Sequence, residues 1–270
     1  MSKVIIQDFT TIKPISMIGA EAGICWGADT TDEEKNRKRG LDCLQSGHMR
    51  TAEYPQVYMV LDGYSARVIR EFYTHIAGGP TRLQASTRYI DYEHGFRYIV
   101  PTKIQKNPAA TMIYLNAMEQ ITEALKELDA LGIPKEDSAN LLPLGMGTKV
   151  VVRTNLRNLI DMSHQRLCTR AYWEFRILMN DIIKALSEYS DQWKYIVQNY
   201  FKPKCEVCGF CSEKYSCGRR PKEEEVKECI EVGRKWKKPS EKNFKELIAF
   251  LSKDEKEDLI QYLFESIKKF

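Results

Sequence analysis

The chain has 270 residues, of which 43% are hydrophobic and 29% are charged. This length and composition allow a sizeable core, and they predict one large domain or one domain with an appendage. The net charge of +4 is too small to indicate binding to polymeric nucleic acid, although it allows a local phosphate site. The sequence contains no apolar run of about 20 residues, and its start lacks the apolar segment of a signal peptide. We therefore expect a cytoplasmic protein with no membrane partner.

The first hundred residues predict two strands and two helices separated by turns. The hydrophobic spacing predicts strands over residues 3–9 and 56–61, and helices over residues 31–43 and 65–75. Asp62-Gly63 is expected to end the second strand, and Gly78-Gly79-Pro80 to end the second helix. Residues 89–100 are rich in aromatic side chains, which suits a strand or extended chain.

The middle of the chain carries the clearest helix signals. Asn107-Pro108 matches an N-capping residue followed by proline at the first helical position, and Gly132 matches a helix end. Apolar residues spaced by three or four predict one long helix between them. Three consecutive valines between Thr148 and Arg153 predict a buried strand. From Asn155, a second long helical stretch is expected to run to about Tyr189.

The character of the sequence changes after residue 200. Residues 1–200 are expected to form a domain of α and β elements, followed by a cysteine-rich loop over 201–221 and a helical tail over 222–270. Within the tail, we expect a charged helix over 222–236 and two short amphipathic helices. The second of these begins at the capping box Ser252–Glu255.

Four of the eight cysteines are clustered with the spacing Cys-x-x-Cys-x-x-Cys-x5-Cys, at Cys205, Cys208, Cys211 and Cys217. Four thiolates can bind zinc tetrahedrally or hold an iron–sulfur cluster, and the spacing does not separate the two. A metal would order a loop that has few apolar side chains of its own. Its role would be to stabilise the tail, to deliver electrons or to dock a partner. Elsewhere, Cys168 is either a nucleophile near arginines or a buried structural thiol.

Ser86-Thr87-Arg88-Tyr89 combines a hydroxyl, successive backbone amides and a guanidinium that can contact two phosphate oxygens. This chemistry predicts an anion site. For four residues taken alone, a strand edge with an exposed arginine is the alternative.

With its neighbours, this segment resembles the flavin-dependent thymidylate synthase family. The family's Arg-Gln-Trp-x-Arg-His-Arg and Ser-x-Arg-Tyr motifs correspond to Arg70, Glu71, His75, Ser86, Arg88 and Tyr89. Thr74 and Ile76 replace the arginines on either side of the family's histidine, and Leu83-Gln84 replaces Asn-Glu. Arg82 is a candidate to return one of the lost guanidinium groups.

A longer stretch downstream is similar to the same family without gaps. Its motifs correspond to Leu142-Pro143-Leu144, Thr148-Lys149, residues 155–159, Arg166 and residues 171–175. Asp161 replaces an asparagine that contacts flavin in the family, Arg170 replaces a histidine, and Ala139 stands where the family has a phosphate-binding arginine. Upstream, His48 and Glu53 resemble a histidine and a glutamate near the flavin. The resemblance covers roughly residues 20–185.

The resemblance implies an α/β protein with a central mixed sheet flanked by helices, assembled as a homotetramer with active sites between subunits. It also implies that FAD, reduced by NADPH, mediates the conversion of dUMP to dTMP with methylenetetrahydrofolate as carbon donor. Arg166 would be catalytic, facing the pyrimidine and the flavin. The nucleotide would be bound by Glu71, Gln84, Ser86, Thr87, Arg88 and Arg166. The flavin would be held by His48, Glu53, His75, Arg82, Asn155, Arg157, Asp161 and Arg170.

Two other functions stay open on the sequence. A flavin-dependent enzyme could modify another pyrimidine nucleotide, because the altered Arg-His-Arg motif lacks two cations. A noncatalytic, metal-stabilised binding protein could use the same fold. Several residues also have structural alternatives: a solvated helix face for Arg157, Arg166 and Arg170 with Arg170 pairing to Glu174, a core position for His75, and an ordinary surface position for Glu53.

Overall fold

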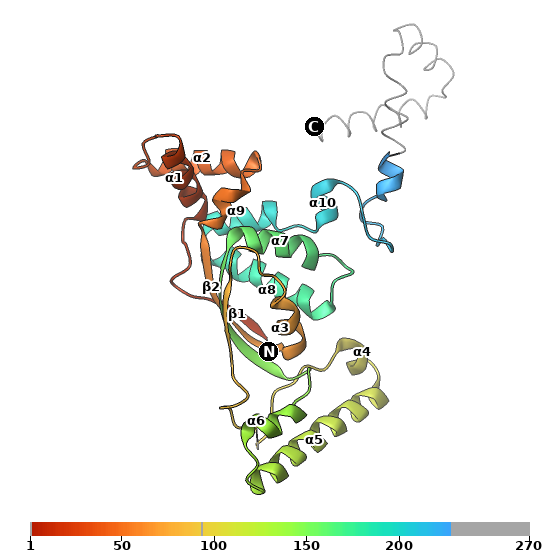
Figure 1. Ribbon diagram of the computed structural model, residues 1–270. Coiled ribbons are helices and arrows are strands. Elements are labelled where there is room, and N and C mark those ends of the chain that lie inside the picture. The colour runs from red at the N-terminus through yellow and green to blue at the C-terminus, as the bar shows by residue number, and fades with distance from the viewer. Residues whose placement is uncertain (1, 93, 228–270) are drawn as a thin grey trace, which may run out of the picture. The chain divides into compact units, whose positions relative to one another are not determined.

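The computed structural model describes residues 2–92 and 94–227. Contacts divide the chain into two compact units, with the boundary between Cys208 and Gly209. The first unit contains the sheet and all the helices labelled in Figure 1. Each unit is described by itself, and the domain boundaries that the sequence suggests at residues 200 and 221 stay a prediction.

A four-stranded antiparallel sheet lies at the centre of the first unit (Figure 1). In spatial order its strands are β1 (Lys3–Ile6), β2 (Gln56–Ser65), β4 (Gly147–Asn155) and β3 (Thr81–Gln84). The combination of α and β elements is confirmed. The expectation of a mixed sheet is wrong for the described strands, because each neighbouring pair is antiparallel. One face of this sheet is buried and the other is partly exposed, which is a common arrangement for antiparallel sheets.

The valine run of β4 shows how the two faces differ. Val150 and Val152 are fully buried, whereas Val151 keeps 41% of its surface exposed. The predicted strand is confirmed, but it is buried on one face only, because successive side chains of a strand point to opposite faces. The expected end of β2 at Asp62-Gly63 is also wrong. Gly63, with φ of 79°, lies at a register shift, and the strand continues to Ser65.

Three helices cover the buried face of the sheet: α3 (Ala66–Phe72), α7 (Leu156–Arg166) and α8 (Trp173–Tyr189). They contact β2, β4 and β1 respectively, and α9 (Asp191–Tyr200) packs against α8. The core between these layers contains the inward side chains of the strands together with the apolar side chains of α8 and α9.

The prediction of one helix from Asn155 to Tyr189 is wrong, because the chain turns between Arg166 and Trp173. The start of α8 is held by a contact with a distant element, since the Glu174 carboxylate accepts hydrogen bonds from the Ser65 backbone and hydroxyl. Cys168 and Arg170 lie in the turn. Pairing of Arg170 with Glu174 along one helix face is therefore excluded.

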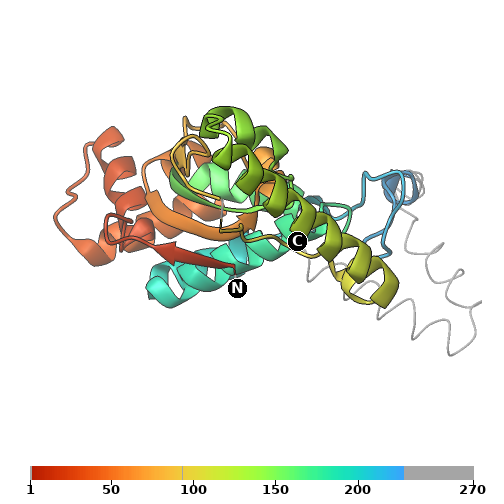
Figure 2. The same ribbon diagram turned by 90° about the horizontal axis from the view of Figure 1, so that it is seen from below.

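The N-terminal helices form a close pair at one end of the first unit (Figures 1 and 2). They are α1 (Pro14–Cys25), which the sequence reasoning missed, and α2 (Glu33–Gln45), which it predicted. Gly19 and Gly40 allow this contact, because a Cβ at either position would lie less than 2 Å from a carbonyl oxygen of the other helix. The short 3-10 helix η1 (Met49–Glu53) then leads into β2.

The segment between β3 and β4 leaves the sheet and returns to it. It contains α4 (Thr102–Gln105), α5 (Pro108–Ala130), α6 (Lys135–Ser138) and η2 (Ala139–Leu141). The prediction of α5 is confirmed, including its N-cap, where the Asn107 side chain accepts a hydrogen bond from the Ala110 amide at 3.1 Å. Residues 89–100 are expected to be a strand or extended chain. The described part, residues 89–92 and 94–100, forms turns and irregular structure with an isolated bridge from Tyr98 to Met146.

The cysteine-rich region spans the boundary between the two units. The short helix α10 (Lys204–Cys208) ends the first unit, and the described part of the second unit contains a bridge between Cys211 and Lys222. The predicted charged helix is present at residues 223–227. Its continuation and the two predicted tail helices lie outside the described residues. In the same described part of the chain, no helix is long and apolar enough to cross a membrane.

Candidate active site

The side chain of Arg166 is held on three sides at the end of α7. Its Nε donates to His75 Nε2 at 2.9 Å, and its Nη1 lies 3.1 Å from Glu71 Oε2. Its Cζ lies 4.5 Å from the centroid of the Phe175 ring. Because α3, α7 and α8 each supply one of these groups, the packing of the three helices determines where the guanidinium lies. Glu71, His75 and Arg166, three of the residues that the sequence proposes, are thus brought together.

His75 follows the C-terminal end of α3 and is 9% exposed. Its ring meets the Phe175 ring edge to face, with centroids 5.7 Å apart. Burial, reinforced by the positive charges of Arg166 and Arg82, lowers the pKa of His75 to about 4. The imidazole is therefore neutral at pH 7, and because its Nε2 accepts a hydrogen bond, its proton must be on Nδ1.

Arg82 of β3 stabilises the turn that carries His75. Its guanidinium donates to the carbonyl oxygens of Tyr73 and His75, and it lies 5.2 Å from the ring centroids of Phe72 and Tyr73. Basic side chains commonly satisfy carbonyl groups at a helix end in this way. In this structure Arg82 holds the backbone on which the candidate active site is built.

Asn155 connects this turn to the start of α7. Its side-chain oxygen accepts from the Asn158 amide at 2.9 Å, which caps α7. Gly78 has φ of 70°, and a Cβ at this position would lie 2.1 Å from Asn155 Nδ2. The glycine is thus required both by its backbone conformation and by the close approach of the capping residue.

A polar cavity of about 430 Å³ lies beside this cluster. It is lined by Thr74, His75, Ile76, Ala77, Asn158, Asp161, His164, Gln165 and Lys204. Two of these residues, His75 and Asp161, are proposed from the sequence as flavin-binding. The sequence reasoning missed Asn158, His164, Gln165 and Lys204. For His164 a signal exists, because it lies three residues after Asp161 and so faces the same side of α7.

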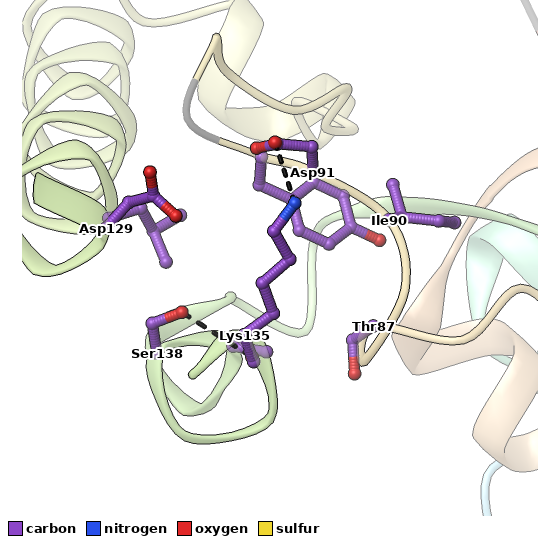
Figure 3. Close-up of a pocket in the computed structure, with 9 residues that line it drawn as sticks. Thr87, Ile90, Asp91, Asp129, Lys135 and Ser138 are labelled. Carbon is purple, nitrogen blue, oxygen red and sulfur yellow. Dashed lines mark hydrogen bonds and ion pairs between the residues drawn. The ribbon is translucent and has the colours of Figure 1, made fainter. Parts of the chain in front are cut away.

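The Ser86–Arg88 segment forms a turn, as an anion site would require. Its neighbours differ from those of Arg166. Arg88 Nε donates to Glu136 Oε2 of α6 at 3.0 Å. Thr87 lines a small pocket of about 20 Å³ together with Ile90, Asp91, Asp129, Lys135 and Ser138 (Figure 3). Lys135 Nζ contacts Asp91 Oδ2 at 2.7 Å in this pocket. The contacts of the turn are therefore with α5 and α6, whereas those of Arg166 are with α3 and α8.

The other proposed site residues belong neither to the Arg166 cluster nor to the Ser86–Arg88 turn. Arg157 Nη1 pairs with Glu53 Oε1 at 2.5 Å, and both side chains are 43% exposed. Gln84 Nε2 lies 3.4 Å from the Thr148 hydroxyl. His48, at the start of η1, and Arg170, in the turn before α8, are exposed.

The four clustered cysteines are divided between the two compact units, with Cys205 and Cys208 in the first and Cys211 and Cys217 in the second. Among residues 2–92 and 94–227, no group of three or more His, Cys, Asp or Glu side chains is arranged as a metal site. The expected four-thiolate centre is therefore not shown by the described residues. It remains a proposal.

Comparison with known proteins gives one consistent result. The model of a family described as "Thymidylate synthase complementing protein" matches residues 10–190. A flavin-dependent thymidylate synthase of Nitratidesulfovibrio vulgaris is 27% identical over 233 residues, which are 78% of this chain and 92% of the relative.

Two solved structures have a similar fold. The thymidylate synthase ThyX of Helicobacter pylori, with FAD and dUMP, superposes with a TM-score of 0.60 at 17% identity, covering 74% of this chain and 99% of that one. The UMP/dUMP methylase PolB of Streptomyces cacaoi, bound to 5-Br dUMP, gives a TM-score of 0.62 at 14% identity, covering 74% and 96% of the two chains. At these identities the structural likeness establishes the fold.

Proposed function

The chain belongs to the thymidylate synthase complementing protein family, and we propose that it is a flavin-dependent thymidylate synthase. The reaction is the reductive methylation of dUMP to dTMP, with methylenetetrahydrofolate as carbon donor and NADPH as reductant, through FAD. The observation that carries the proposal is the guanidinium of Arg166, which His75, Glu71 and Phe175 hold next to a polar cavity.

The cavity fits part of a flavin dinucleotide. Its volume of about 430 Å³ lies in the range of about 300–1,000 Å³ that is typical of ligand sites. His75 and Asp161, which line it, are the residues here that we propose to hold FAD, with Asn155 positioning the turn that carries His75. When bound and reduced by NADPH, the flavin would supply the hydride. The other proposed FAD residues are His48, Glu53, Arg82, Arg157 and Arg170.

Arg166 is the residue proposed to act on the pyrimidine. A guanidinium held in place before the reaction can stabilise negative charge that develops on a pyrimidine carbonyl oxygen, without the cost of reorganising at that moment. Glu71 and His75 keep it oriented. No cysteine nucleophile is required in this proposal, and Cys168 lies in the turn between α7 and α8.

The nucleotide phosphate is proposed to bind at Ser86, Thr87 and Arg88. The ion pair between Arg88 and Glu136 is well exposed, and such pairs contribute only about 0–1 kcal/mol to stability. A phosphate dianion can therefore replace the Glu136 carboxylate at small cost. Gln84 lies next to this turn on β3.

We propose that the protein is a homotetramer whose active sites lie between subunits. Two features support this. The phosphate turn and Arg166 have separate neighbours within one chain, so a second copy can complete each site. The outer face of the sheet is also partly apolar, because Ile5, Val151 and Leu83 are 43%, 41% and 74% exposed.

The alternative within the same chemistry is the modification of another pyrimidine nucleotide. It is favoured by Thr74 and Ile76, which line the cavity without charge where the family resemblance implies arginines. One protein of similar fold is described as a UMP/dUMP methylase. Assays with dUMP and UMP in parallel separate the two possibilities.

The experiment that tests the proposal is direct. Purified protein is incubated with excess FAD, and the bound flavin is measured by co-elution and by quenching of flavin fluorescence. Conversion of dUMP is then measured with methylenetetrahydrofolate and NADPH. Binding of FAD and formation of dTMP would support the proposal, whereas absence of flavin binding would favour the noncatalytic binding protein.

Cys205, Cys208, Cys211 and Cys217 are proposed to bind zinc or an iron–sulfur cluster. We expect about one zinc, or one iron–sulfur cluster, per chain when anaerobically prepared protein is analysed for metals. Cys208→Ser should then increase proteolysis after residue 200, because the loop would lose a ligand of the metal that orders it. Four titratable thiols in this segment, with neither metal present, would contradict the expectation.

A further inference from the structure

Lys204 lines the same cavity as His75 and Asp161. It is the first residue of α10, which packs against α7, and it belongs to the first compact unit. It also lies outside residues 10–190, which the family model matches. A segment beyond the family-matched region thus contributes a basic side chain to the candidate flavin site.

Few of the side chains that line the cavity carry a charge, and Lys204 is one of them. Thr74 and Ile76 are uncharged, and the imidazole of His75 is neutral at pH 7. The pKa of His164 is lowered by burial, against the opposing effect of the Asp161 charge, and the charge of Lys204 lowers it further. Among the nine lining residues, Lys204 is the one lysine or arginine, and Asp161 is the one with a carboxyl group.

Building on the proposed function, we propose that Lys204 binds a phosphate group of the flavin dinucleotide in this cavity. A lysine ammonium is a compact charge on a flexible stem and can follow a phosphate without a fixed geometry. The charge-assisted hydrogen bond that it makes is stronger than one between neutral groups. Lys204, which follows the family-matched residues in the chain, would then supply a positive charge to this site. Thr74 and Ile76, which stand where the resemblance implies arginines, do not.

The test compares FAD and riboflavin, which has the same ring system but no phosphate. Lys204→Gln should weaken FAD binding about tenfold, as expected for loss of one charge-assisted contact, and should leave riboflavin binding unchanged. Lys204→Arg should restore most of the FAD affinity. Lys194→Gln, an exposed position on α9, is the matched control and should bind both ligands like the unchanged protein. Thermal unfolding of each variant confirms that it is folded.

The outcomes are distinguishable. Unchanged FAD affinity in Lys204→Gln, with FAD bound by the unchanged protein, would overturn this inference and leave the proposed function in place. An equal loss of FAD and riboflavin would also overturn it, because the lysine would then act on the shape of the cavity. If the unchanged protein binds no FAD, both proposals fail.

Discussion

The side chain of Arg166 is largely buried and is held by three different neighbours. Its side chain is only 20% exposed, and its guanidinium has an anionic, a neutral and an aromatic neighbour. The planar fork of arginine can contact Glu71 and His75 at the same time, whereas a lysine ammonium has no matching geometry. If Arg166 is catalytic, as we propose, the orientation of its guanidinium would matter to the reaction in addition to its charge.

Arg166→Lys keeps the positive charge but removes the planar guanidinium that contacts Glu71 and His75. If Arg166 is catalytic, this variant should reduce kcat/KM for dTMP formation by about 100-fold or more, in line with the loss of an oriented transition-state donor. Steady-state kinetics measure the effect. Arg37→Lys, an exposed position on α2, serves as the control. Activity within twofold of the unchanged enzyme would remove Arg166 from the catalytic role.

His75 makes the stability of the protein depend on pH. Its pKa is about 4 in the fold against 6.5 as the ordinary value, so the unfolded chain binds more protons between these two values. The contribution of neutral His75 to the free energy of unfolding should therefore be fully present above about pH 7. It should fall by about 2 kcal/mol as the pH is lowered towards 4.5.

Urea unfolding at pH 7 and pH 5 measures this dependence. His75→Gln should reduce it, because the variant has no imidazole at this position to titrate. Some dependence will remain in His75→Gln, because burial also lowers the pKa of His164. A steeper loss of stability in His75→Gln than in the unchanged protein would contradict the assignment.

At the scale of elements, the position of α3 depends on a contact between two helix starts. Ser65 caps α3 by accepting from the Val68 amide, and it is itself held by Glu174 at the start of α8. Glu174 is 3% exposed and accepts its hydrogen bonds from Ser65 across 109 positions of sequence. Since α3 carries Glu71 and precedes His75, and α8 carries Phe175, this contact helps to place those residues relative to Phe175.

Glu174→Ala should lower the free energy of unfolding by about 3 kcal/mol, because it leaves the buried Ser65 amide and hydroxyl without their acceptor. Chemical denaturation gives the value. Glu188→Ala, at an exposed position of the same helix, should change stability by less than about 0.5 kcal/mol. Equal effects of the two substitutions would show that the contact does not hold the helices together.

At the scale of the whole molecule, an apolar row crosses the outer face of the sheet. The pairings Ile5 with Val60, Val60 with Val151, and Val151 with Leu83 place one residue from each strand in this row. Arg153 lies on the same exposed face of β4, two residues from Val151 in the direction of α7, so a charged side chain follows the apolar row on this strand. An exposed row of this kind is typical of a surface that another protein covers.

We expect the proposed tetramer to use this face. Light scattering at micromolar concentration should give the mass of four chains, and Leu83→Asp should shift the protein to smaller species by placing a charge in the apolar row. Lys38→Asp, an exposed position on α2, controls for the added negative charge. A monomeric mass for the unchanged protein would contradict both the tetramer and the shared active site.

Local signals in the sequence were sufficient for α2, for α5 and for parts of the sheet. The start of α5 at Asn107-Pro108 and the alternation of β2 depend on residues that are close in sequence, so their chemistry can be read without the fold. Motif resemblance also indicated the family, because the spacing of Ser86 to Tyr89 and of Asn155 to Arg166 is itself a sequence property.

Only the tertiary structure decided how these residues are used. The turn between α7 and α8, the contacts of Arg166 with Glu71 and His75, and the presence of Lys204 in the cavity all depend on groups separated by tens of residues. Helix periodicity continues through residues 167–172, and nothing local in the sequence indicates the distant Ser65 that holds Glu174. Composition, motifs and helix caps could be determined from the sequence, because they depend on residue type and on short spacings. The pairing of charges across helices depends on packing and could be determined only from the fold.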